Sequence, residues 1–277
     1  MIACRGLTKR FGEFAAVDGL DLEVGAGTIV GFLGANGAGK STTIRMLVGL
    51  LRPTAGSAEL GGVPAEEPEA RRDLGYMPSD PAFYVALSGR ENLDLLAALH
   101  GRGAPDRDWA AGLLGLSDAD LARPVREYSG GMVQKLALVQ AVQHRPALVI
   151  LDEPANRLDP LVHRRFEEMV RHIAGDGRTV FLSSHTLSEV EDLCHSVAMI
   201  RAGKLLAHRS VDELADLGTR RLHAVLRSGE VVDERLPRGE LGRVRELLAR
   251  DDVADLTIEP ATLEEAFLEL YEDGGRR

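Results

Sequence analysis

The residues with the clearest chemical meaning form the glycine-rich segment 34–41, which reads GANGAGKS. Glycines let a backbone wrap closely around phosphate oxygens, while loop N–H groups and the start of a following helix supply partial positive charge. Lys40 adds a full charge for the β- and γ-phosphates, and the Ser41 hydroxyl is suited to Mg²⁺. The motif predicts a nucleoside triphosphate site with contacts from Gly34, Asn36, Gly37, Ala38, Gly39, Lys40, Ser41 and Thr42.

The segments that flank this loop match the context that it requires. Residues 28–33 form a short apolar stretch typical of a buried strand, and residues 42–50 carry an apolar face typical of a helix. A strand, a glycine loop and a helix in this order favour phosphate binding over the alternative, a glycine loop that precedes a helix by chance.

Two adjacent carboxylates follow a second apolar stretch, residues 148–151. At the end of a buried strand, Asp152 would lie beside the triphosphate and hold Mg²⁺ directly or through water. Glu153 would then polarise a water for in-line attack on the γ-phosphate. A surface acidic pair is the alternative, and the phosphate loop upstream disfavours it.

Ser129, Gly130 and Gly131 precede a helical stretch and begin 23 residues before Asp152. A serine and two glycines at a helix start form a nest of N–H groups suited to anions, although this triplet is common in loops. Together with the phosphate loop and the acidic pair, these residues resemble the ATP-binding cassette family. Residues 129–131 correspond to its signature, and residues 152–159 to its acidic strand end and following loop.

The resemblance extends to three further positions. His185, 33 residues after Asp152, resembles the family's switch histidine, which would hydrogen-bond the γ-phosphate and orient the attacking water; a structural histidine is the alternative. Asp159 lies in a Leu-Asp-Pro segment that resembles the loop through which two nucleotide sites communicate. Phe11 is placed where the family has an aromatic residue that stacks on adenine, with an ordinary core aromatic as the alternative.

The resemblance covers residues 2–210 and implies an α/β fold. It implies a P-loop NTPase core of the RecA type, an antiparallel β subdomain, and a helical signature subdomain at about residues 80–145. It also implies a homodimer in which ATP lies between the phosphate loop of one copy and residues 129–131 of the other. ATP hydrolysis would then drive a membrane permease through the helical subdomain. Segment 263–270 resembles the subfamily that serves exporters of drugs, antibiotics or lipids.

Several positions depart from the family pattern. Ser79 stands where the family has a glutamine that contacts Mg²⁺ and the attacking water, and Asp80 or a water is the hypothesised substitute. The other departures lie in the signature and in the loop after the acidic pair: Tyr128, Met132, Ala155 and Arg157. We expect these changes to affect the rate of hydrolysis rather than the reaction itself.

The apolar patterning predicts the elements that position these residues. Period-two alternation indicates strands over residues 1–35, and a helical region over 88–145 begins with Ser88 as N-cap and Glu91 as its capping-box partner. Apolar runs at 147–151, 179–183 and 196–200 predict parallel strands buried on both faces. After about residue 215 the pattern predicts an edge-like strand at 222–227, a helix at 241–250, a strand at 256–258 and a final helix at 262–270. Two domains are therefore expected, at 1–215 and 216–277.

The composition limits the kinds of partner. The 277 residues carry a formal net charge of −10, which argues against nucleic acid as the main partner. Cys4 and Cys194 lie far apart, which predicts buried small side chains in a reducing compartment. No window of about 18 apolar residues occurs, so a separately encoded permease is expected, with this chain on the inner, cytoplasmic face of the membrane.

Two other functions stay open at this level. One is an ATPase of the same family that acts on ribosomes or DNA rather than in transport. The other is a nucleotide sensor with negligible turnover, which Ser79 motivates. The sequence does not identify the cargo or the permease.

Overall fold

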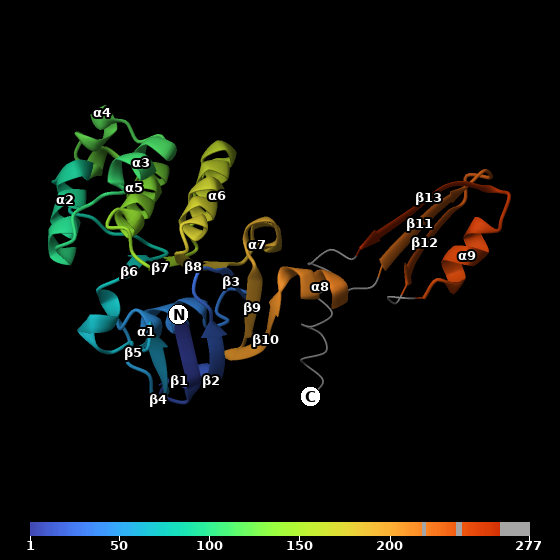
Figure 1. Ribbon diagram of the computed structural model, residues 1–277, viewed down its shortest axis with the longest axis horizontal. Helices are drawn as coiled ribbons and strands as arrows, with labels where there is room; N and C mark the ends of the chain where they lie inside the picture. Colours follow the sequence, from blue (N-terminus) through green and yellow to red (C-terminus); the bar gives the residue numbers. More distant parts are fainter. Residues whose placement is uncertain (218–219, 237–239, 261–277) are drawn as a thin grey trace. The chain divides into compact units, whose positions relative to one another are not determined.

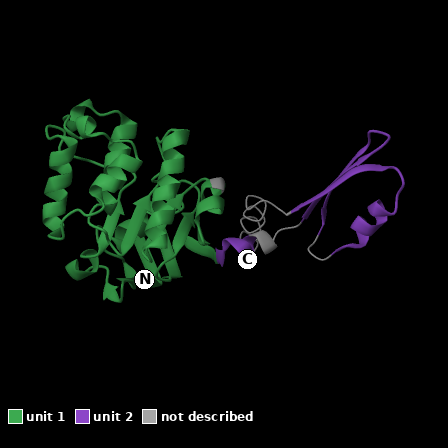
Figure 2. Cartoon of the chain, turned by 45° about the horizontal axis from the view of Figure 1, so that its top comes forward, with its two compact units in different colours: residues 1–208 green, residues 209–277 purple. Residues whose placement is uncertain are grey.

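The computed structural model describes residues 1–217, 220–236 and 240–260. The chain divides into two compact units, Met1–His208 and Arg209–Arg277, which Figure 2 colours separately. The boundary falls in strand β10 (Lys204–Ser210), a few residues before position 215, where the sequence changes character. Each unit has a hydrophobic core of its own.

A six-stranded sheet forms the centre of the first unit, with strand order β10-β9-β3-β8-β7-β6. Strands β9, β3, β8, β7 and β6 run parallel to one another. Every residue of β3 (Ile29–Leu33), β7 (Leu148–Asp152) and β8 (Thr179–Ser184) is buried, which confirms strands covered on both faces. Strand β6 (Leu74–Met77) lies at one edge of this sheet, and β9 (Ser196–Arg201) lies between β3 and the other edge strand, β10. The carboxyl ends of β3, β8 and β7 are adjacent, so the segments that follow these strands meet at one edge of the sheet.

An antiparallel sheet lies beside the central one, with strand order β2-β1-β4-β5. Its strands are β1 (Ile2–Phe11), β2 (Phe14–Val24), β4 (Ala55–Leu60) and β5 (Val63–Pro64). Helix α1 (Lys40–Leu47) and the short 3₁₀ helix η1 (Pro68–Arg71) belong to the same region. One core cluster joins the two sheets and α1; its largest fully buried members include Leu7, Leu20, Phe32, Ile44, Met46 and Phe181.

A block of helices lies between β6 and β7 in the chain, and Figure 1 shows it at one end of the first unit. Its elements are α2 (Gly89–His100), α3 (Arg107–Leu113), α4 (Asp118–Leu121), η2 (Val125–Glu127) and α5 (Gly130–Val142). The predicted capping box of α2 is confirmed: Ser88 Oγ accepts from Glu91 N at 3.2 Å, and Glu91 Oε2 accepts from Ser88 N at 2.7 Å. Helices α6 (Pro160–Gly175) and α7 (Leu187–Leu193) follow β7 and β8.

Buried charges tie the helical block to the central sheet. Arg178 Nη1 donates to Asp106 Oδ2 at 2.8 Å, and the two side chains are only 8% and 10% exposed. Arg145 lies 3.6 Å from Asp106 and 3.0 Å from Asp176, and Arg178 also reaches Asp176 at 3.2 Å. Because a buried charge is costly unless it is paired, this cluster holds the start of α3 against the end of α6 and the start of β8.

The second unit begins with α8 (Val211–Leu217) and contains a three-stranded antiparallel sheet, order β12-β11-β13. The edge position predicted for residues 222–227 is wrong, because β11 (Arg220–Leu226) is the central strand. It pairs with β12 (Val231–Leu236), which was not predicted, and with β13 (Val253–Pro260). Helix α9 (Gly242–Leu248) buries Val244 and Leu247 in the small core of this sheet. The helix predicted at 262–270 lies outside the described residues.

Candidate active site

The phosphate loop connects β3 to α1, and its glycines permit a conformation that other residues resist. Gly37 and Gly39 have φ values of 81° and 110°, in the left-handed region. A Cβ at Gly39 would lie 2.5 Å from Ala16 O, so only glycine fits where the loop packs on β2. No described side chain caps the start of α1, so its first N–H groups are available to an anion.

Lys40 lies beneath the loop with its side chain 4% exposed. Its Nζ donates to Gly34 O at 2.7 Å and lies 3.5 Å from Glu153 Oε1. A buried ammonium needs a negative partner, and Glu153 supplies that charge in this conformation. A phosphate group that entered the loop would supply the same charge.

Ser183, at the end of β8, orients both members of the acidic pair. Its Oγ donates to Asp152 Oδ1 at 2.6 Å and accepts from Glu153 N at 2.9 Å. Glu153 has a φ of 52°, a left-handed conformation that costs a non-glycine residue about 1 kcal/mol. Asn156 Nδ2 donates to Glu153 Oε2 at 2.6 Å, so the second carboxylate oxygen is also held. The strained glutamate is therefore fixed by its neighbours on both sides.

His185 follows β8 and approaches the same carboxylate. Its Nδ1 lies 3.9 Å from Glu153 Oε1, and its side chain is 46% exposed. Glu153 Oε1 therefore has the Lys40 ammonium on one side and the His185 imidazole on the other. Lys40 lies at the start of α1, which follows β3, whereas Glu153 follows β7 and His185 follows β8. Because β3, β8 and β7 are neighbours in the sheet, the three side chains meet at the same edge.

A cavity of about 360 Å³ opens above the phosphate loop. Phe11 lines it with 52% of its surface exposed, so the alternative of a core aromatic is wrong. Phe14, 65% exposed, lines it as well and was missed by the sequence reasoning. Phe11 and Phe14 are paired across the β1–β2 hairpin, so the two-residue turn between them was the available signal. The full lining is Phe11, Phe14, Ala16, Ala35, Asn36, Gly37, Gly39, Lys40, Ser41, Thr42 and Glu153.

The other predicted site residues lie apart from this cavity. Ser129 and Gly130 are exposed, and Ser129 Oγ accepts from Met132 N at 3.3 Å as the N-cap of α5, which Gly130 and Gly131 begin. Asp159 is exposed and caps α6, and hydrogen bonds from the N–H groups of Val162 and Leu161 lower its pKa. Of the predicted loop residues, Gly34 and Ala38 are not among the described residues that line the cavity. Ser129, Gly130 and Asp159 thus lie at exposed starts of helices within one copy.

Comparison with known proteins identifies the family. A family model described as ABC transporter matches residues 17–156. A bacitracin transport ATP-binding protein of Bacillus licheniformis is 34% identical over 99% of this chain and 98% of its own length. This chain belongs to the ABC transporter family. It is an ATP-binding ATPase subunit of this family.

Two further comparisons agree with this assignment of the ATPase subunit. A daunorubicin resistance ATP-binding protein of Streptomyces coeruleorubidus is 40% identical over 82% of this chain and 73% of its own length. The solved structure of an ATP-binding subunit of an ABC transporter matches with a TM-score of 0.76 and 26% identity, over 98% of this chain and 99% of that one. The predicted α/β fold is confirmed. Within the described residues of the ATPase subunit, no helix has the length and apolar character to cross a membrane.

Gln134 is a second residue of the ATPase subunit that the sequence reasoning missed. It lies on α5, is 1% exposed, and its Nε2 donates to Pro154 O at 2.9 Å, with Glu153 O at 3.4 Å. The helix that begins with the signature is thereby joined to the loop that follows the acidic pair. The available signal was the apolar character of most of this helix, because an amide that is buried among apolar side chains requires a polar partner.

The structure describes the surroundings of Tyr128, which departs from the family pattern, and of Asp80, the hypothesised substitute for the missing glutamine. Tyr128 donates its hydroxyl to Asp120 O at 2.7 Å and packs on Gly89, where a Cβ would lie 2.2 Å from the tyrosine oxygen. The tyrosine thus joins α5 to α4 and to the start of α2. Asp80 is 91% exposed and lies 3.9 Å from Arg157, and the described cavity lining does not include it. In this conformation Asp80 faces Arg157, and its role in place of the family's glutamine stays a prediction.

Proposed function

We propose that this ATPase subunit powers the export of an antibiotic or related drug, or of a lipid, through a separate membrane permease. The names of the two relatives concern bacitracin transport and daunorubicin resistance. The proposal extends to the cargo class only, because contacts with the cargo would lie in the permease.

The proposed ATP hydrolysis rests on one observation: Lys40 Nζ at 3.5 Å and His185 Nδ1 at 3.9 Å both approach Glu153 Oε1. We assign Lys40 to the β- and γ-phosphates, where its buried ammonium would exchange Glu153 for phosphate oxygens. Glu153, once released, would accept a proton from the attacking water. His185 would donate to the γ-phosphate and orient that water.

The acidic pair also fits a divalent cation. Asp152 Oδ2 is buried and has no hydrogen-bond partner among the described residues, while Oδ1 is held by Ser183. An unpartnered carboxylate oxygen next to Glu153, which reaches Lys40 of the phosphate loop, suits Mg²⁺, with Ser41 from the cavity lining as the second protein ligand. No group of three or more histidine, cysteine or acidic side chains could hold a metal in the described part of the chain, so phosphate oxygens would complete the coordination. Bound Mg²⁺ would neutralise charge on the β- and γ-phosphates.

We further propose that the site is completed by a second copy. Ser129, Gly130 and Asp159 are exposed, and none is among the described residues that line the cavity. The start of α5 is a nest of N–H groups suited to the γ-phosphate of a nucleotide bound by another chain. ATP held between two copies would close the dimer, and hydrolysis would release it.

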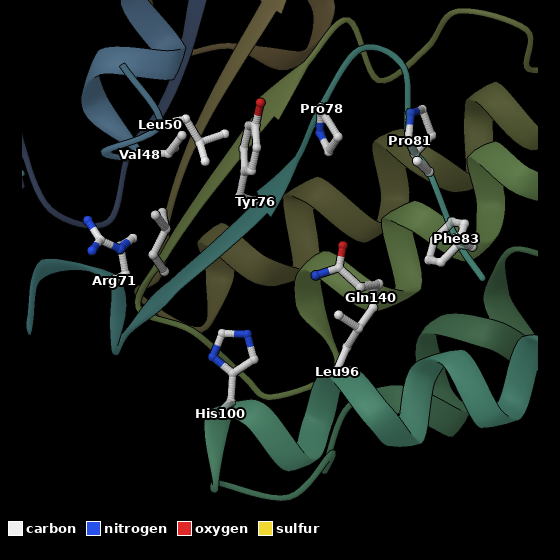
Figure 3. Close-up of a pocket in the computed structure, with 12 residues that line it drawn as sticks. Val48, Leu50, Arg71, Tyr76, Pro78, Pro81, Phe83, Leu96, His100 and Gln140 are labelled. Carbon is white, nitrogen blue, oxygen red and sulfur yellow. The ribbon is translucent and has the colours of Figure 1, made fainter. Parts of the chain in front are cut away.

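The permease contact is proposed at a groove between the core and the helical block. A second cavity, of about 310 Å³, lies there, and Figure 3 shows side chains from β6, α2 and α5 around it, including Tyr76, Leu96, His100 and Gln140. The walls are mainly apolar, and Arg71 provides a cation at one side. A short permease helix with an apolar face and a carboxylate at one end would fit this groove. Docking there would hold the ATPase on the cytoplasmic face of the membrane.

The proposed chemistry is tested by ATP hydrolysis of the purified subunit and of its complex with the permease. Glu153→Gln should lower kcat at least about 100-fold while it preserves ATP binding, because only the proton acceptor is lost. Glu168→Gln, the same change at an exposed position on α6, is the matched control and should leave kcat unchanged. Equal turnover of wild type and Glu153→Gln would remove Glu153 from the reaction.

The transport proposal is tested separately by purification of the tagged subunit from membranes. A specifically bound integral membrane protein supports it. Retention on ribosomes or nucleic acid in place of a membrane protein would favour the non-transport alternative. A wild-type subunit that binds ATP but is inert with its permease would favour the sensor.

A further inference from the structure

His163, on the first turns of α6, lies between two carboxylates from different helices. Its Nδ1 is 3.3 Å from Glu167 Oε1 on the same helix, and its Nε2 is 3.5 Å from Glu189 Oε1 on α7. The three side chains are 25%, 18% and 27% exposed, so solvent screens the contacts less than at an open surface. The imidazole therefore bridges α6 to α7.

On the α7 side of this bridge, Glu189 also contacts the segment that carries His185. Glu189 uses its other oxygen, Oε2, to accept from Ser184 Oγ at 2.7 Å. Ser184 Oγ in turn accepts from Thr186 N at 2.9 Å. The two residues on either side of His185 are thus fixed to each other, and the fixing hydroxyl is bonded to Glu189.

On the α6 side of the bridge, His163 is bonded to Asp159. His163 N donates to Asp159 O at 2.8 Å in the first turn of α6, which Asp159 caps. A continuous set of contacts therefore runs from the exposed residue at the proposed dimer contact, through His163 and Glu189, to the segment that carries His185.

The protonation state of the ring decides how many of these contacts attract. An imidazolium has an N–H on both nitrogens and pairs with both carboxylates, whereas a neutral ring donates to one and turns a lone pair toward the other. Among the described residues, the charged groups that face the ring are Glu167 and Glu189; Arg171 pairs with Glu167 at 3.3 Å. The other histidine of α6, His172, lies near the opposite end of the helix, where its ring packs against Trp109 of α3.

We propose that His163 is a positioning residue for the proposed hydrolysis: it holds the His185 segment against the helix that follows Asp159, and it does so fully only as an imidazolium. The proposal rests on the role of His185 stated above. His163 is not among the described residues that line the nucleotide cavity, so its loss should lower kcat and leave the KM for ATP unchanged.

The test uses three variants of the full chain, with kcat and KM for ATP measured at one pH. His163→Arg keeps a cation between the two carboxylates, whereas His163→Gln removes it, so kcat should be about threefold to tenfold lower in His163→Gln than in His163→Arg, the loss of one partly buried charged contact. The KM for ATP should be the same in both variants. His172→Gln is the matched control, because His172 lies on the same helix and the ion pair described for it is with a single carboxylate, Asp176 at 3.9 Å; its kcat should equal that of the wild type.

Backbone hydrogen exchange supplies a readout that does not depend on turnover. Exchange across residues 184–194 should be faster in His163→Gln than in His163→Arg, with both corrected for pH. Identical exchange, or equal kcat in His163→Gln and His163→Arg, would overturn the proposal. Failure of the proposed function would give a different result. In that case His185→Ala would leave kcat unchanged, while hydrogen exchange across residues 184–194 would still differ between His163→Gln and His163→Arg.

Discussion

His144 predicts that the first unit loses stability in mild acid. The ring is 2% exposed, its Nε2 donates to Leu74 O at 3.1 Å, and its Nδ1 has no partner among the described residues. His100 stacks on it with ring centroids 3.9 Å apart. Burial, and secondly the nearby His100, lower the pKa of His144 from 6.5 to about 4.

The sign and size of the effect follow from proton linkage. Between about pH 6.5 and pH 4 the unfolded chain binds a proton at this ring and the folded chain does not, so acid favours unfolding. The contribution of the neutral ring is complete above this range and is lost as the pH falls. The loss is about 2 kcal/mol from pH 7.5 to pH 5 and on the order of 3 kcal/mol below pH 4.

The assay is urea unfolding followed by the fluorescence of Trp109, the single tryptophan, which lies on α3 in the same unit. His144→Gln places an amide nitrogen near the position of Nε2, so it can donate to Leu74 O but does not titrate, and its free energy of unfolding should fall by about 2 kcal/mol less than that of the wild type over the same interval. Carboxylates that titrate in both proteins cancel in the difference. Parallel loss of stability in the two proteins would refute the reasoning.

Three further changes have outcomes that the structure determines. Arg178→Met should cost about 3–5 kcal/mol in free energy of unfolding, because Asp106 stays buried and Arg145 at 3.6 Å is its one remaining ion-pair partner among the described residues; Asp106→Asn in the same chain should restore part of that loss in urea unfolding. Phe11→Ala should raise the KM for ATP about tenfold by removing one stacking surface, and Phe11→Trp should not; an unchanged KM for Phe11→Ala would exclude stacking. Arg157→Gly should raise the free energy of unfolding by up to about 1 kcal/mol, because the φ of Arg157 is 68°, whereas Arg157→Ala should give no gain.

The features that the sequence predicted well are those that neighbouring residues determine. The loop at 34–41 requires glycines at fixed spacing, and the capping box at Ser88 is complete within four residues. The apolar runs of β7 and β8 also predict burial on both faces without knowledge of their partners.

The features that the sequence missed depend on contacts between distant segments. Residues 231–236 contain three charged residues in a row, Asp233 to Arg235, because only one face of β12 packs on a core. The strand was therefore missed, and with it the central position of β11 in the sheet. Gln134 acquires its role only when α5 meets the loop after β7. Likewise, His163 becomes a bridge only because Glu189 approaches it from α7.

The site itself was predicted as a set of residues but not as a conformation. The motifs indicated that Lys40, Glu153 and His185 belong together, and the structure brings them together around one oxygen. The pairing of Lys40 with Glu153 was not predicted, because it depends on the strained backbone of Glu153 and on Ser183 behind it.

The central claim, a nucleotide site shared between two copies, is tested most directly by mixing two inert variants. Lys40→Ala removes the phosphate contact, and Gly130→Glu places a carboxylate at the start of α5, where a Cβ meets only Arg157 Cδ at 3.9 Å. Mixed dimers would contain one intact site, so an equal mixture should recover about a quarter of the wild-type ATPase rate. A mixture that stays as inert as either variant alone would contradict the account.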